Sequence, residues 1–186
     1  MVGPIYAYAP SGATALRRAL GPARALAHAG HLIDGRLVRA ELLEPRVIDA
    51  LAPATDVATL DGLAGELDAL RITLAPGDAS GPTHGHVAWV AGVARREGEE
   101  VAFEGGLELA DERLRVIDGV AGEGAILDEG ARLVLGADAR AWLAEADFAE
   151  LAGGEITADS QPHRALFLGV RSAASWRARV ELQTDE

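Results

Sequence analysis

Short segments in which charged and apolar residues alternate, separated by turn signals, constrain the fold of this chain most strongly. The clearest runs from Arg36 to Leu42, directly after the turn dipeptide Asp34–Gly35. Further segments lie at 46–51, 66–74, 84–95, 100–109, 113–117, 132–135 and 176–182. A period of two residues is typical of half-buried strands, and Asp-Gly is a strong hairpin signal. The pattern predicts a mostly β protein, an antiparallel β-sandwich of Ig-like or related Greek-key type.

The start of the chain differs from this pattern. Ile5–Tyr8 is expected as a short extended segment and Thr14–Leu20 as a short helix. Together they predict an N-terminal extension over residues 1–22, followed by one β-sandwich domain over residues 23–186. The domain is expected to open with a strand over residues 24–33.

One or two short helices are expected in the C-terminal third. Asp138 precedes a helical pattern that runs to Leu151, where glycines follow. Asp159 or Ser160 is suited to cap a second helix, because Pro162 stands in what would be its first turn. The Asp118–Gly119 pair is expected to end a strand.

Composition excludes several classes of function. The chain has 186 residues, a net charge of -12, no cysteine and 17 basic residues, all of them arginines. Nucleic-acid binding through a basic face is not expected, and disulfides and thiolate metal sites are excluded. No apolar run is long enough for a transmembrane helix. The first residues carry no export signal, so an exported native form, with or without a lipid anchor, would have lost its signal.

The five histidines are the most informative candidates for chemistry. Four form close pairs, His28 with His31 and His84 with His86. On a strand, His84 and His86 would share a face and could converge on one metal ion, with His28 or His31 joining. Imidazole ligands without cysteine suit copper or zinc. The alternative is that all four are polar loop and edge residues, and His163 is expected to be a surface or capping residue.

The other candidate residues point less strongly to a functional site. The three tryptophans Trp89, Trp142 and Trp176 are expected as core anchors, although Trp89 stands close enough to His86 to lie beside a metal site. Carboxylates at positions 97, 99, 100, 104 and 108 are expected on a solvated strand edge. No serine lies in a nucleophile-elbow motif and no glycine run matches a dinucleotide fingerprint, so an enzyme is not expected.

A resemblance to known families comes from three short stretches, which are His84–Val90, the hairpin through Leu109, and Phe167–Ser172. Over roughly residues 63–182 the chain resembles uncharacterised secreted β-rich lipoproteins of GC-rich proteobacteria. More distantly it is similar to the periplasmic copper-binding proteins associated with methanobactin uptake. That second resemblance implies an exported β-sandwich with a histidine-containing copper site near a tryptophan, onto which His84, His86 and Trp89 would map.

Two functions are therefore expected. The first is a non-enzymatic periplasmic or cell-surface β-sandwich that binds a ligand, with a transition metal held by His84, His86 and His28 or His31. The second is an interaction or structural module that binds an unknown partner protein through an acidic β surface and holds no metal. The first predicts binding of copper or zinc, and the second predicts an exposed apolar patch or a dimer interface.

Overall fold

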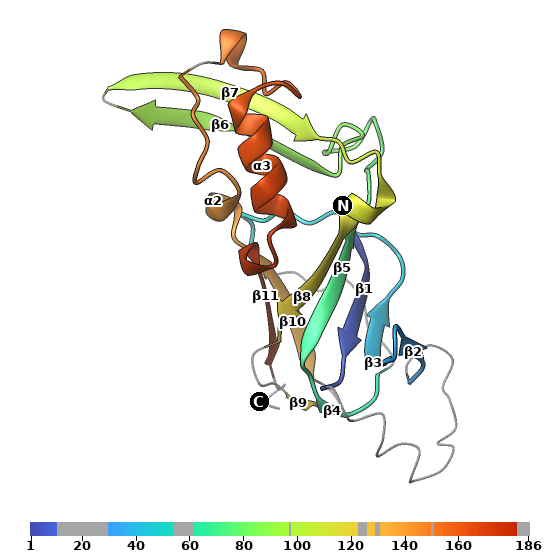
Figure 1. Cartoon of the computed structure of the whole chain (residues 1–186). Helices are drawn as coiled ribbons and strands as arrows, with labels where there is room; N and C mark the ends of the chain where they lie inside the picture. Colours follow the sequence, from blue (N-terminus) through green and yellow to red (C-terminus); the bar gives the residue numbers. More distant parts are fainter. Residues whose placement is uncertain are drawn as a thin grey trace.

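The computed structural model describes residues 1–10, 30–53, 62–96, 98–122, 126–128, 131–149 and 151–181. In these residues the predicted class is confirmed, because the protein is mostly β with antiparallel sheets and short helices near its C-terminal end (Figure 1). The helix predicted at 14–20, most of the strand predicted at 24–33, and His28 lie outside the described residues.

The main sheet has five antiparallel strands in the order β2-β3-β1-β5-β8. They are β2 (Leu32–Ile33), β3 (Arg36–Leu42), β1 (Val2–Tyr8), β5 (Ala69–Leu74) and β8 (Val116–Ala121). Strand β1 is central, with Ile5 paired to Leu42 on one side and to Ile72 on the other. The segment that we assigned to an N-terminal extension therefore supplies the middle strand of the sheet.

Alternation along the strands separates a core face from an outer face, as predicted. In β5, Leu70, Ile72 and Leu74 are buried, whereas Arg71 and Thr73 are only half-buried. The predicted turn at Asp34–Gly35 joins β2 to β3, and both residues have positive φ angles of 50° and 77°. A two-residue turn of the I′ type requires this backbone geometry, which Asp-Gly adopts readily.

A bulge in β8 corrects one prediction. Asp118–Gly119 does not end the strand, because pairing with β5 continues on both sides, from Ile117 opposite Ile72 to Val120 opposite Leu70. The extra residue is accommodated by Gly119, whose φ of 77° suits glycine. The bulge brings Ile117 and Val120 onto the core face, where both are buried.

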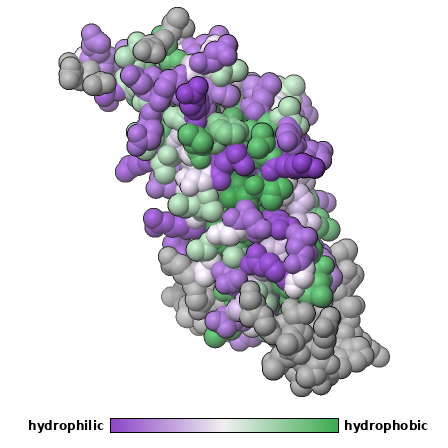
Figure 2. All heavy atoms as spheres, in the orientation of Figure 1, coloured by the Kyte–Doolittle hydropathy of each residue, from purple (hydrophilic) through white to green (hydrophobic). Residues whose placement is uncertain are grey.

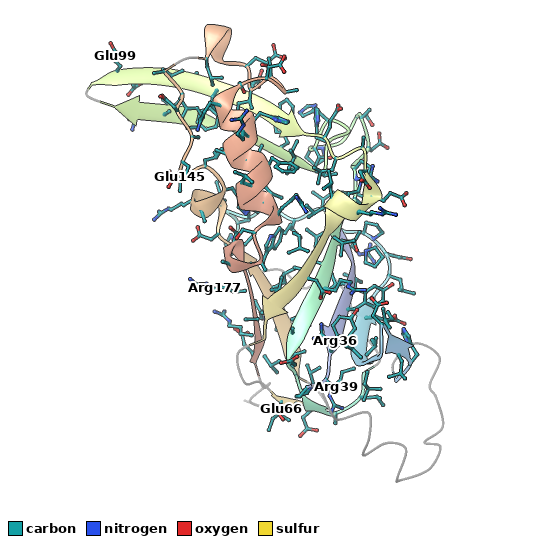
Figure 3. All side chains as sticks on the ribbon, viewed as in Figure 1. Arg36, Arg39, Glu66, Glu99, Glu145 and Arg177 are labelled. Carbon is teal, nitrogen blue, oxygen red and sulfur yellow. The ribbon has the colours of Figure 1, made fainter. Side chains whose placement is uncertain are left out.

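A second, smaller layer shares the core and gives a sandwich-like arrangement. It pairs β10 (Arg132–Ala137) with β11 (Trp176–Glu181), and Ala178 in β11 forms a bridge with Gly122, just after β8. Trp176 and Ala178 are buried, while Arg177 points away from the body (Figure 3). The two-residue strands β4 (Gly65–Glu66) and β9 (Ile126–Leu127) pair at one end.

The long hairpin of β6 (Ala88–Arg96) and β7 (Glu99–Leu107) confirms the predicted hairpin and extends away from the main sheet (Figure 1). Glu99 lies at its tip (Figure 3). On the face seen in Figure 2, hydrophobic residues gather near the middle of the molecule, between the hairpin and the main sheet. No helix in the described part of the chain has the length and apolar character needed to span a membrane.

Three other predictions are wrong in detail. The segment at 113–117 begins as the helical turn η1 (Glu112–Arg115), because the Asp111 side chain accepts from the Arg113 amide and caps it. Residues 46–51 form no strand, and only Arg46 joins a bridge, to Val2. The helix expected at 138–151 is limited to α2 (Ala139–Trp142).

Helix α2 is short because the backbone after it finds partners elsewhere. Asp138 caps its first turn by accepting from the Arg140 and Ala141 amides. Beyond it, the side chain of Gln161 accepts from the Asp147 amide at 2.6 Å and donates to the Glu145 carbonyl at 2.7 Å. These bonds replace those of a continuing helix, and the short turn η2 (Ala152–Gly154) follows.

Helix α3 (Gln161–Arg171) confirms the second predicted helix. Ser160 is the N-cap and Pro162 stands in the first turn. The helix packs closely on α2, because any side chain at Gly169 would collide with the Trp142 backbone. Trp142 and Trp176 are buried core residues, as predicted, with ring centroids 5.6 Å apart, and the turn η3 (Ala173–Ser175) leads from α3 into β11.

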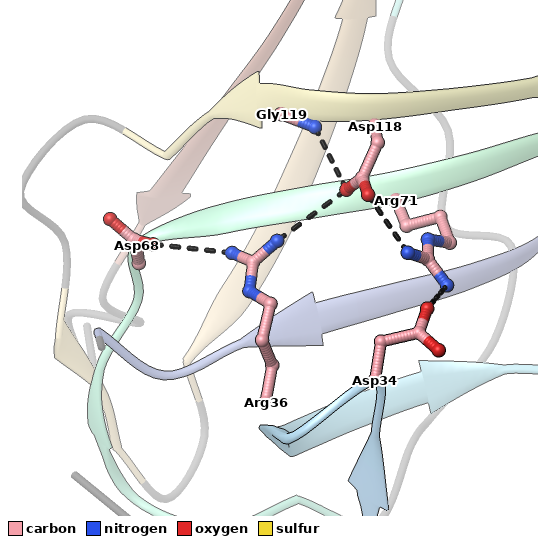
Figure 4. A network of polar contacts seen from close by, with 6 residues as sticks. All are labelled: Asp34, Arg36, Asp68, Arg71, Asp118 and Gly119. Carbon is pink, nitrogen blue, oxygen red and sulfur yellow. Dashed lines mark hydrogen bonds and ion pairs between the residues drawn. The ribbon is translucent and has the colours of Figure 1, made fainter. Parts of the chain in front are cut away.

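The outer face of the main sheet carries a network of ion pairs (Figure 4). Arg36 contacts Asp68 and Asp118, and Arg71 contacts Asp34 and Asp118, the last two both at 2.8 Å. Both guanidinium groups lie over the ring of the fully buried Tyr8, at 4.2 and 5.7 Å from its centroid. Because each guanidinium group is paired with two carboxylates above a buried ring, we assign the network a structural role.

Candidate functional site

A cleft of about 680 Å³ lies at the base of the β6–β7 hairpin. One wall is formed by residues 153–158, which run beside β7, where the Ile156 amide donates to the Glu104 carbonyl at 2.8 Å. The side chains that carry chemistry in this hairpin-base cleft are His86, Trp89, Glu104, Glu108, Glu155, Thr157 and His163. These residues come from three parts of the sequence.

His84 and His86 lie in a turn, so the prediction that they lie on a strand is wrong. His84 has a φ of 50° and Gly85 a φ of 85°. The Asp78 carbonyl accepts from the Gly81 and Gly85 amides, and the Thr83 carbonyl accepts from the His86 amide. Consecutive positive φ angles and these bonds curl the segment, so β6 begins only at Ala88.

The turn nevertheless brings both imidazoles to Trp89. The ring centroid of His84 lies 4.5 Å from that of Trp89, and the centroid of His86 lies 5.4 Å from it. Tilted ring pairs at such distances are favourable contacts. Trp89 is half-buried, unlike the other two tryptophans, so the predicted grouping of His84, His86 and Trp89 exists, although His84 does not line the cleft.

His86 lies against the backbone of β7. A Cβ atom at Gly106 would overlap its ring, so the glycine makes this close approach feasible. Its Nδ1 atom is buried, lies 3.7 Å from Glu108 Oε1, and has no hydrogen-bond partner among the described residues. A buried polar atom without a partner is costly, so this nitrogen would gain stability from a ligand that could reach it.

His163 is the residue that sequence reasoning missed. It stands in the first turn of α3, where its amide donates to Ser160 Oγ at 3.3 Å, and its side chain lines the cleft. Burial lowers the pKa of His163 and nearby His86 lowers it further, while Glu108 and Asp159 oppose the shift. Its imidazole is therefore neutral at pH 7 and can act as a ligand.

His31 does not join this cleft. Its Nε2 lies 3.8 Å from Glu41 Oε2, and its carbonyl accepts from Val38, which pairs with Tyr8 at one end of β1. Residue 87 lies at the other end, where its carbonyl accepts from the Met1 amino group. A strand of this length separates the two ends by roughly 20 Å.

The acidic side chains of the hairpin divide between two places. Glu104 and Glu108 line the cleft, whereas Glu99 and Glu100 lie at the hairpin tip, where Glu100 pairs with Arg95 at 2.7 Å. Glu97 lies outside the described residues. In the described part of the chain, no group of three or more histidine or acidic residues is arranged so that it could hold a metal ion.

In comparisons with family models, curated proteins and solved structures, no match to this chain was found. The hairpin-base cleft is therefore interpreted from its own chemistry. Its titratable lining consists of two imidazoles and three carboxylates, with no arginine among the lining residues. A ligand that suits this lining carries positive charge.

Proposed function

We propose that this protein is a non-enzymatic, exported ligand-binding β-sandwich protein that binds a cation in the hairpin-base cleft. The observation that carries the proposal is the cleft lining, which offers imidazole and carboxylate groups and no arginine. Export is part of the proposal through the expected resemblance to secreted lipoproteins alone, and it is tested by locating the native protein in cell fractions.

A divalent transition metal, copper or zinc, is the cation that we favour. His86 has a buried nitrogen without a hydrogen-bond partner in the described structure, His163 is neutral at pH 7, and Glu108 interacts electrostatically with both. Two imidazoles and a carboxylate form a ligand set typical of these metals. The three groups do not form a ready-made metal site in the structure, so their side chains would have to move to bind the ion, and we expect moderate affinity at most. This proposal replaces the predicted partners His28 and His31 with His163.

Calorimetric titration of the tag-free protein with Cu²⁺, Zn²⁺ and Ni²⁺ tests the proposal, with Ca²⁺ and a diamine as comparison ligands. We expect a transition metal to bind more tightly than about 1 mM, and His86→Ala or His163→Ala to weaken it about tenfold or more. His31→Ala is the matched control, because His31 lies at the other end of β1, and it should leave binding unchanged.

Trp89 gives an independent measurement. Because both imidazoles of the 84–86 turn contact its ring, bound Cu²⁺ should quench its fluorescence, and Trp89→Phe should abolish most of the quenching. Binding of the diamine alone would support a cation site but overturn the metal assignment. Failure of every cation to bind more tightly than about 1 mM would overturn the function itself.

A further inference from the structure

The outer edge of β6 is an open strand edge. Strands β6 and β7 form nine consecutive pairs without a register shift, from Ala88 opposite Leu107 to Arg96 opposite Glu99. On the far side of β7, Glu104 forms a bridge with Glu155, so that edge is partly covered. On the far side of β6, no described residue forms a bridge or a backbone hydrogen bond. Alternate amide and carbonyl groups of β6 therefore face outward without a backbone partner in the described structure.

This edge has few of the features by which proteins usually prevent edge pairing. Residues 88–96 contain no proline, lysine or carboxylate, the strand has no bulge, and its only charges, Arg95 and Arg96, stand at the hairpin tip. Val93 is 52% exposed, and it stands in the outer half of the hairpin. A long and regular edge strand that is apolar or glycine from Ala88 to Ala94 is suited to accept another strand.

We infer that the strand added to this edge is β6 of a second copy of the chain, in antiparallel orientation, which forms a symmetric dimer. Each copy carries a net charge of -12, and β6 is a nine-residue stretch without carboxylates at which two such copies can approach. A two-fold axis also makes the contact self-complementary, since each copy offers the same open edge.

Charge and side-chain size favour one arrangement of the two strands. With the axis at Gly92, Val93 of one copy lies opposite Ala91 of the other, and Arg95 lies opposite Trp89. An arginine facing an aromatic ring is a favourable pair. A parallel, in-register arrangement would instead place Arg95 opposite Arg95, which is unfavourable. The antiparallel dimer also brings the tip of each hairpin to the 84–86 turn of the other copy.

Sedimentation velocity over a range of concentrations tests the dimer. Val93→Lys introduces the charge that blocks strand edges, so we expect it to weaken association about tenfold or more. Val116→Lys is the matched control, because Val116 is also an exposed valine in an edge strand, that of the main sheet, and it should leave association unchanged. A protein that is monomeric at all concentrations, or a dimer that is insensitive to Val93→Lys, would overturn the inference.

Cysteine crosslinking tests the register without depending on the lysine variant, since the chain has no cysteine of its own. Opposite residues in an antiparallel pair have Cβ atoms about 5 Å apart, within reach of a disulfide. A mixture of Ala91→Cys and Val93→Cys proteins should crosslink faster than either protein alone. Equal rates in all three samples would exclude this register. Sedimentation and crosslinking report association and register and not cation binding, so the dimer and the proposed cation site can fail separately even though Trp89 belongs to both.

Discussion

At the scale of single residues, Gly106 determines where His86 can lie. A side chain at this position would overlap the imidazole. Because glycine has none, the ring can lie against β7 and beside Glu108. The sequence contains many glycines, and nothing in its spacing distinguishes this one, because the ring that needs the space comes from a turn about twenty residues earlier.

We expect Gly106→Ala to displace His86 and to lower the free energy of unfolding by about 1–3 kcal/mol, as overpacking commonly does. Urea unfolding measures this loss. Gly136→Ala is the control, because the nearest atom to its added methyl group would lie at 3.9 Å, an ordinary contact. An equal loss in both variants would contradict the role of Gly106.

A second residue-scale prediction concerns Asp118. Burial acts to raise the pKa of Asp118, but the hydrogen bond and charge of Arg71, with help from Gly119 and Arg36, outweigh it and lower the pKa. A lowered pKa in the folded state stabilises the fold fully above the unfolded value of about 3.9, and this contribution is lost as the pH falls through the folded value.

Wild-type protein should therefore lose stability as the pH falls below about 4, and Asp118→Asn should show a shallower loss over the same range. Urea unfolding at a series of pH values measures both slopes. Asp138→Asn is a suitable comparison, because it removes a carboxylate outside this network. Its loss of unfolding free energy with falling pH should match that of the wild type. Identical slopes in wild type and Asp118→Asn would contradict the assignment.

At the scale of secondary-structure elements, local chemistry identified α3 correctly and α2 only in part. Ser160 and Pro162 define the start of α3, and their effect depends only on adjacent residues. The length of α2 depends instead on Gln161, which bonds the backbone at residues 145 and 147 across the fold. A pattern of apolar positions alone cannot reveal this competition.

Ser160→Ala should lower the free energy of unfolding by about 1 kcal/mol, because the His163 amide loses its cap. Thermal or urea unfolding detects a change of this size. Ser172→Ala is the matched control, since Ser172 begins η3 without a side-chain cap bond, and its effect should stay within about 0.5 kcal/mol. Comparable losses in the two variants would argue against the cap.

At the scale of the whole molecule, the fold class followed from the sequence and the site followed only in part. Alternation located β3, β5, β7 and β11, and Asp34–Gly35 located a turn, because these signals are local. That His86 and His163 line the same cleft depends on α3 packing beside the hairpin, a contact between segments far apart in the chain. Of the closely spaced His84 and His86, only His86 lines the cleft, and no local signal pointed to His163.

The position of β1 has a consequence for the order in which the chain acquires structure. Strand β1 has to keep both of its edges unpaired until β3 and β5, which follow it in the sequence, have been synthesised. The shared core is completed later still, because Trp176 and Ala178 enter it near residue 180. Because such distant contacts form only after long loops have closed, we expect this topology to fold slowly and to leave the edges of β1 exposed in the meantime.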